Sequence, residues 1–133
     1  MAFPNTGTVT GRPETRSVQV ATNLTGKEYT FVKLSTLNKV VATADATATP
    51  YVLTEGVDGS VTERTVAIVI GGRTKIKLGG TVAIGDRLTA TTGGVAIATT
   101  TDGDEYGLIA EAAGVSGDII PATFAEGTIS NPA

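Results

Sequence analysis

The chain has 133 residues, of which 41% are hydrophobic and only 17% are charged, and its formal net charge is −3. Thr is the commonest residue and Gly occurs 17 times, a composition typical of strands and turns, and the length suits a single domain. The chain contains neither Cys nor His, which removes thiolate nucleophiles, imidazole bases and the commonest metal ligands. We therefore expect a protein that is not an enzyme and that holds no metal and no cofactor.

The charges are divided unevenly along the sequence. All 10 Lys and Arg residues lie between Met1 and Arg87 beside seven acids, whereas residues 88–133 hold six acids and no base. The two parts should attract oppositely charged surfaces, on each other or on a partner.

The amino terminus lacks the pattern of a packed element. Its first sixteen residues contain two prolines and two glycines without periodicity, so we predict an extended arm over residues 1–16 and one β domain over residues 17–133. An ordinary disordered terminus is the alternative. The terminus does not resemble a secretory signal, and the longest apolar run, Val66–Ile70, is too short to span a bilayer. We expect a soluble protein that is made without an export signal.

Short runs of β-type sequence begin at Ser17, each bounded by turn formers or small polar residues. The first predicted strands are 17–21, 28–34, 39–43 and 51–54. Residues 44–50 could form one helical turn, but Pro50 would end it, so we predict a loop.

The middle of the chain gives the clearest local prediction. The runs 63–70 and 73–78 are joined by Gly71-Gly72, a two-residue connection that supplies the positive φ values of a tight β-hairpin. In the second run Thr74, Ile76 and Leu78 alternate with Arg73, Lys75 and Lys77, so one face is predicted to be core. The other face is a cationic stripe, defined as Arg73, Lys75 and Lys77. It is either a solvated face that blocks a sheet edge or a contact for an acidic protein partner.

Further strands are predicted over 81–84, 87–91, 95–99, 106–113 and 118–124. Regularly spaced turn signals predict an all-β fold, a small antiparallel β-barrel or sandwich with Gly-rich hairpins and an extended N-terminal arm. Pro121 cannot donate a ladder hydrogen bond, which places the last run at an edge or bulge. The segment Val-Ala-Ile occurs three times at uneven spacing, so we predict no internal repeat.

Possible chemical motifs lack the groups that they require. Ser116 in the segment GVSGD resembles a nucleophile turn, but the chain has no His to act as its base. Asp102, Asp104 and Glu105 lie together in a Gly-containing loop that matches neither a pair of carboxylates with separated pKa values nor a calcium-binding loop. Nucleotide-binding glycine patterns are absent, and aromatic residues are only 5% of the chain, so we expect no nucleic-acid partner.

Three segments after Leu53 carry a resemblance to a known family. They are EGVDGSVTERTVAIVIGGRTKIKLGG (55–80), VAIGDRLTATTGGVAIATT (82–100) and YGLIAEAAGVSGDIIPATF (106–124). A Gly-Asp-x-Leu turn leads to a Gly hairpin, and an Ala-Glu-Ala-Ala segment then precedes a Gly-Asp turn and the final strand. In this order and spacing the chain resembles the capsid decoration, or cement, proteins of tailed phages. The part before Leu53 is less recognisable, and the arm is longer than the compact starts of that family.

The resemblance implies a structural virion protein that decorates and stabilises a phage capsid. It implies a small β domain, commonly a homotrimer, that binds the major capsid protein on the outer surface of the head and contacts no membrane. An extended arm could add a strand to a neighbour's sheet edge, and several weak contacts on one oligomer would reinforce one another. The candidates for capsid contact are Phe3, Pro4, Arg12 and Arg16 in the arm, with the cationic stripe as a possible second contact.

Two other interpretations were compared with this one. A phage tail, baseplate or adhesin β domain would bind a receptor or carbohydrate, but such sites cluster aromatic side chains in a groove, and the Tyr and Phe residues of this chain are scattered. A self-splicing enzyme would use a strand-turn-strand like GDRLTATTGGVA, but it needs a His and an N-terminal Cys or Ser. The receptor-binding domain is the alternative that stays open.

Overall fold

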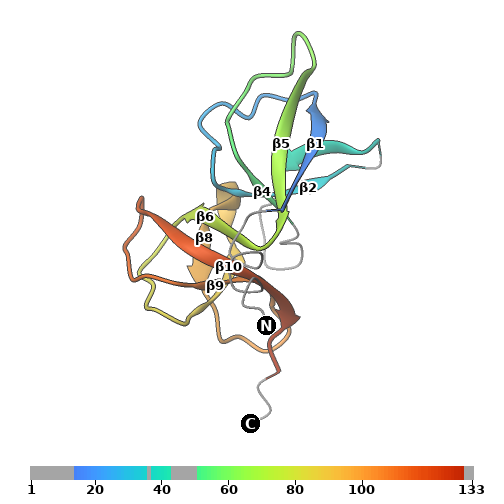
Figure 1. The fold of residues 1–133 in the computed structure, drawn as a ribbon. Helices are drawn as coiled ribbons and strands as arrows, with labels where there is room; N and C mark the ends of the chain where they lie inside the picture. Colours follow the sequence, from blue (N-terminus) through green and yellow to red (C-terminus); the bar gives the residue numbers. More distant parts are fainter. Residues whose placement is uncertain (1–13, 36, 43–50, 131–133) are drawn as a thin grey trace, which may run out of the picture.

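The computed structural model describes residues 14–35, 37–42 and 51–130, and the regular elements within these ranges are strands and one short 3-10 turn (Figure 1). The all-β fold class predicted from the sequence is confirmed. No helix in the described part is long and apolar enough to cross a membrane. In chain order the elements are β1 (Glu14–Val20), β2 (Phe31–Leu34), β3 (Lys39–Ala42), β4 (Tyr51–Leu53), β5 (Arg64–Gly71), β6 (Arg73–Lys77), β7 (Arg87–Ala90), η1 (Thr92–Gly94), β8 (Ala96–Ala98), β9 (Glu105–Ala110) and β10 (Ile119–Thr128).

The first five strands close into a barrel in the order β1-β3-β2-β4-β5. β1 runs antiparallel to β5 from Glu14, opposite Gly71, to Val20, opposite Arg64, and it pairs in parallel with β3 on its other edge. Burial alternates along β1, with Val18 and Val20 inside, because successive side chains of a strand point to opposite faces. Every strand contributes to the barrel interior, which consists of Val18, Val20, Leu24, Val32, Val40, Leu53, Val66 and Ile68.

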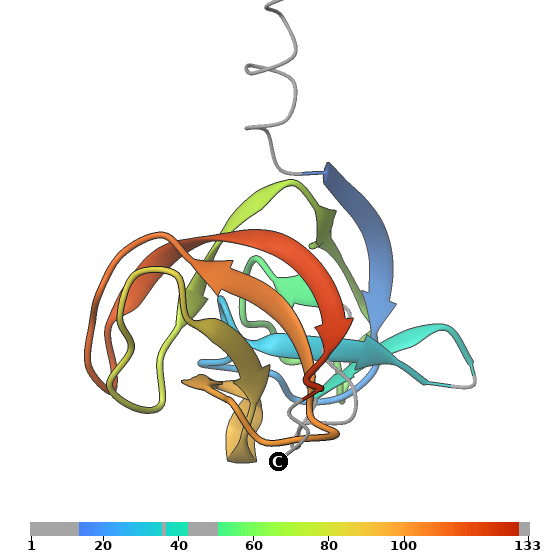
Figure 2. The same ribbon diagram turned by 90° about the horizontal axis from the view of Figure 1, so that it is seen from below.

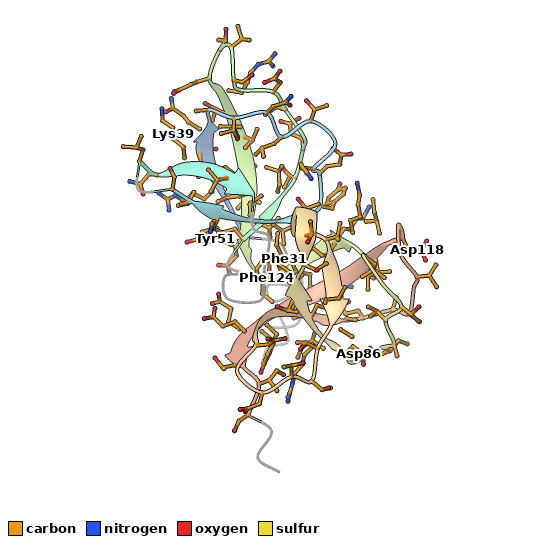
Figure 3. The ribbon with its side chains drawn as sticks, turned by 180° about the vertical axis from the view of Figure 1, so that it is seen from behind. Phe31, Lys39, Tyr51, Asp86, Asp118 and Phe124 are labelled. Atoms are coloured by element: carbon orange, nitrogen blue, oxygen red, sulfur yellow. The ribbon has the colours of Figure 1, made fainter. Side chains whose placement is uncertain are left out.

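The last five strands form a second sheet in the order β6-β10-β9-β7-β8, the β6–β10 sheet, and all of its strand pairs are antiparallel. An isolated parallel bridge between Leu78 and Ala96 brings the two ends of this sheet together. Its buried core continues into the barrel, because Phe31 and Val69 of the barrel belong to the same cluster as Ile76 and Leu88. Phe124 packs against that cluster, and Figure 3 labels it and Phe31 in the region where the two parts meet. A single set of buried side chains therefore joins the two parts.

The predicted hairpin at Gly71-Gly72 is wrong. β5 and β6 follow each other in the chain, but they belong to different sheets in the described structure. The reason is that β1 and β4 already occupy both edges of β5, so no edge is left for β6. Gly72 does adopt a positive φ of 78°, and it turns the chain out of the barrel into the second sheet. The Gly-rich hairpin between β7 and β8, in contrast, is present.

Two other local predictions also differ from the structure. Residues 81–84 form no strand and contribute one isolated bridge, Val82 to Gly114. The last strand is not at an edge, because β10 lies between β6 and β9, and its shift of register falls between Phe124 and Gly127, beyond Pro121. Pro121 is tolerated there because it lies opposite Glu111, just beyond the end of β9, where no N–H of β10 is required for the strand pairing. Residues 14–16 of the predicted arm belong to β1, which begins at Glu14, and residues 1–13 lie outside the described residues.

The prediction that the chain has no internal repeat is wrong as well. The unit β6-turn-β7 recurs as β9-turn-β10 at a constant offset of 32 residues, the separation of Asp86 from Asp118. In the pair β7–β9, Leu88 lies opposite Leu108. The equivalent pair is β10–β6, in which Ile120 lies opposite Ile76. The β6–β10 sheet therefore contains a local two-fold repeat.

The two turns of this repeat have the same hydrogen bonds. In the first, the Asp86 carboxylate accepts the N–H of Ala83 at 2.8 Å, and in the second the Asp118 carboxylate accepts the N–H of Val115 at 3.0 Å. Gly85 and Gly117 occupy the left-handed position before each Asp, with φ of 89° and 92°. The loops that carry these turns lie on the same side of the sheet in Figure 2, where the bridge between Val82 and Gly114 connects them.

Candidate functional site

The cationic stripe lies on β6, an edge strand of the second sheet. The predicted alternation is confirmed at Ile76 and Leu78, which are buried, and at Arg73 and Lys75, which are exposed, whereas Thr74 on the predicted core face is half-buried. Lys77, the third member of the stripe, is half-buried. The stripe therefore faces outward at the corner where the chain leaves the barrel.

Arg73 at the start of the stripe is held by Glu111, which follows β9. The Nε of Arg73 lies 3.1 Å from both carboxylate oxygens of Glu111, and a terminal nitrogen of the guanidinium completes a bidentate ion pair. Thr123 of β10 donates its hydroxyl to the same carboxylate. The hydrogen bond from Arg73 lowers the pKa of Glu111, with a smaller contribution from Thr123. The positive charge of Arg73 is thus largely matched within the chain.

The other two cations of the stripe reach toward the barrel. The ammonium group of Lys75 lies 6.0 Å from the centre of the Tyr29 ring, and that of Lys77 lies 3.3 Å from the carbonyl oxygen of Gly26. The backbone N–H of Lys77 donates to the carbonyl of Tyr29 at 2.7 Å. In the described part of the chain, neither lysine has a carboxylate partner within ion-pair distance.

Tyr29 connects the barrel to the β6–β10 sheet in an uncommon backbone conformation. Its φ is +60°, in the left-handed region that aromatic residues rarely occupy. Two backbone hydrogen bonds fix it there, one from its N–H to the carbonyl of Leu53 at 2.8 Å and one to its carbonyl from Lys77. Such conformations persist where the surrounding structure enforces them, and they concentrate at functional sites.

A hollow of about 370 Å³, the corner hollow, lies beside this tyrosine, and apolar atoms make up most of its wall. Both parts of the molecule contribute to it. Its walls include Thr15, Tyr29, Thr54 and Val69 from the barrel and Lys75 and Pro121 from the second sheet. The sequence did not indicate this hollow, because it forms only when the barrel and the sheet meet.

The predicted arm contacts are only partly placed. Arg16 lies within β1, opposite Ile68 of β5, and its side chain is exposed. Phe3, Pro4 and Arg12 lie outside the described residues. The candidates for capsid contact therefore remain predictions, and Arg16 belongs to the barrel wall instead of an extended arm.

Two other surfaces could contact a partner. Ile84 and Val115, on the two loops of the repeat, are 72% and 55% exposed. A larger, open and more polar groove of about 730 Å³ runs beside Arg87, whose guanidinium carbon lies 5.2 Å from the centre of the Tyr106 ring. Asp86, which belongs to the first of these loops and is labelled in Figure 3, also lines the groove. Neither surface was anticipated from the sequence.

The acidic loop and Ser116 occupy ordinary turns. Asp104 accepts the hydroxyl of Thr99 at 2.6 Å, and Glu105 begins β9. Ser116 is exposed at the tip of the second repeat turn. Within the described ranges, no group of three or more acidic side chains is arranged to hold a metal ion.

Comparison with known proteins gives a structural likeness but no match in sequence. No family model matches the chain, and no curated protein matches it. Among solved structures, the N base of head fiber gp8.5 in bacteriophage phi29 is similar, with a TM-score of 0.69 and 16% sequence identity. The match covers 89% of this chain and 100% of that chain. At this identity the likeness shows that the two chains share a fold, which includes both the barrel and the second sheet.

Proposed function

We propose that this chain is a structural protein of a tailed-phage virion that attaches to the outside of the head and decorates it. It is made in the host cytoplasm and assembles as a homotrimer on the major capsid protein. It performs no catalysis, since the chain has no His or Cys and its acidic and serine motifs lie in simple turns. Its role is to hold neighbouring capsid subunits together.

The single observation that carries this proposal is the match to the phi29 head fiber base along that whole chain. The likeness covers barrel and sheet together, so it is not limited to one common β motif. The sequence resemblance between Leu53 and Gly127 leads to the same class of protein by a separate route, because it depends on turn and strand motifs and not on the fold.

Binding to phage heads tests the proposal directly. Purified protein is mixed with mature, expanded heads and with unexpanded shells of the same phage, and bound protein is measured after sedimentation. We expect saturable binding to mature heads only, and light scattering coupled to size exclusion should give the mass of a trimer. Several weak contacts on one trimer would make this binding much tighter than that of a single copy.

A monomer that binds neither particle would contradict the proposed function. Specific retention on a glycan array, without binding to heads, would favour the receptor-binding alternative. These outcomes separate the two classes because the same protein preparation is used for both.

A further inference from the structure

The outer edge of β6 has backbone N–H groups that no other described residue accepts. The N–H of Leu78 donates to the carbonyl of Asp118 and the N–H of Phe124 donates to the carbonyl of Gly72, each at 2.8 Å. The backbone groups of the even-numbered residues of β6 therefore point toward β10. The backbone groups of the odd-numbered residues point away from β10, because this direction alternates along an antiparallel strand. The N–H of Lys77 donates to Tyr29, whereas the N–H groups of Arg73 and Lys75, two residues that line the corner hollow, have no backbone acceptor within residues 14–35, 37–42 and 51–130.

The corner hollow beside this edge is suited to an apolar side chain. Its wall is mostly apolar, and the ring of Tyr29 is held there by a left-handed backbone that two hydrogen bonds enforce. A pocket next to an open strand edge is the arrangement by which proteins bind extended peptides, because the edge supplies backbone hydrogen bonds and the pocket selects a side chain.

The charges at this edge indicate which kind of segment would bind. Lys75 and Lys77 have no carboxylate partner in the described part of the chain. If the β6 edges of two copies paired, their lysines and arginines would oppose one another, and like charges directly opposite are destabilising. An acidic segment would meet complementary charge instead.

We propose that β6 and the corner hollow are the docking site for an extended, acidic segment of the capsid shell. The segment adds as a strand to β6, places one apolar side chain against Tyr29 and Val69, and sets a carboxylate against Lys75. This inference rests on the proposed function, since it names the shell as the partner, and it assigns to the cationic stripe the role of selecting the segment.

Two variants with matched controls test the docking site. Lys75→Glu reverses the charge at the edge, and Lys33→Glu makes the same change on an exposed residue of β2. Tyr29→Gly removes the aromatic ring, and glycine is compatible with the left-handed backbone at this position. Its control is Asn38→Gly, which removes a side chain at the other described non-glycine residue of positive φ, where φ is 59°. We expect each test variant to weaken binding to mature heads at least tenfold, and each control to stay within about twofold of the wild type, an exposed site away from the interface being nearly neutral.

Hydrogen exchange supplies a second measurement that does not depend on a substitution. Peptides spanning β6 should exchange more slowly when the wild-type protein is bound to heads, because the N–H groups of Arg73 and Lys75 gain acceptors.

If the test variants bind heads as the wild type does and hydrogen exchange in β6 is unchanged, the docking site is wrong although the proposed function stands. If Lys75→Glu alters the oligomeric mass and not head binding, the occupant is a second copy and the inference is overturned. If the wild type binds no heads, the proposed function and the docking site both fail.

Discussion

The barrel and the β6–β10 sheet are built in different ways from similar sequence. The barrel contains a parallel strand pair, β1 with β3, that joins segments distant in the chain, and its strands are closed on both edges. The second sheet repeats one corner, a strand, a Gly-Asp turn and another strand, and at its outer strand β6 the N–H groups of Arg73 and Lys75 have no backbone acceptor among the described residues. The barrel strands are paired on both edges, so the proposed docking site lies at the junction between the two parts, beside β6.

The largest expected effect comes from removing the side chain that both parts share. Phe31 belongs to the barrel by sequence, but it is fully buried in the cluster that includes the second sheet. Phe31→Ala should destabilise the protein by about 3–5 kcal/mol, the usual cost of such a cavity, as measured by urea unfolding. Backbone amide hydrogens of this variant should exchange faster in β9 and β10 as well as in the barrel.

Ile68→Ala is the matched control for that experiment. Ile68 is also fully buried, but it lies in the cluster inside the barrel, and its loss should cost about 2–5 kcal/mol. We expect local exchange in β9 and β10 to respond more to Phe31→Ala than to Ile68→Ala. An identical response would mean that the two buried clusters act as one core and that the division between barrel and sheet has no energetic basis.

A smaller effect should reveal whether the two turns of the repeat are equivalent. A Cβ added at Gly85 or at Gly117 would meet no atom within 4 Å, so the cost of an Ala arises only from the left-handed backbone. Gly85→Ala and Gly117→Ala should each destabilise the protein by about 1–2 kcal/mol and by nearly equal amounts. Gly80→Ala, at a glycine without positive φ, should change stability by less than about 0.5 kcal/mol. Clearly unequal costs at Gly85 and Gly117 would show that only one turn is needed to hold the sheet.

The sequence predicted what depends on near neighbours and missed what depends on distant ones. Alternation along β6 identified Ile76 and Leu78 as core because strand periodicity is local. The Gly71-Gly72 hairpin failed because the partners of β5 lie elsewhere in the chain. The fold class was predictable for the same local reason, as turns and strand propensities are spread along the whole sequence.

The candidate site was less predictable than the fold. The cationic stripe was found, but the corner hollow requires Tyr29 in a left-handed conformation, which is set by Leu53 and Lys77 and not by the residues next to it. The repeat is inconspicuous in the sequence because its two copies share only Gly-Asp and alternating apolar positions, and the Val-Ala-Ile segments do not follow its spacing. The offset of 32 residues is visible only between Gly85-Asp86 and Gly117-Asp118.

The smallest effect concerns a contact that only one copy of the repeat makes. Glu111 binds Arg73, and the equivalent position in the other copy is Gly79, so the ion pair breaks the symmetry of the sheet. The folded-state pKa of Glu111 is lowered, chiefly by the hydrogen bond from Arg73, so its contribution to stability is present above the ordinary value of 4.5 and is lost as the pH falls through the lowered value.

A double-mutant cycle of Arg73→Gln and Glu111→Gln measures that contribution. It should give a small favourable coupling at pH 7, since exposed ion pairs contribute little, and the coupling should vanish at a pH low enough to protonate Glu111. Urea unfolding of the four proteins at each pH provides the measurement. Coupling that is unchanged in acid would mean that the contact is held by the geometry of the strands and not by charge, and the asymmetry between the two copies would then lie in packing alone.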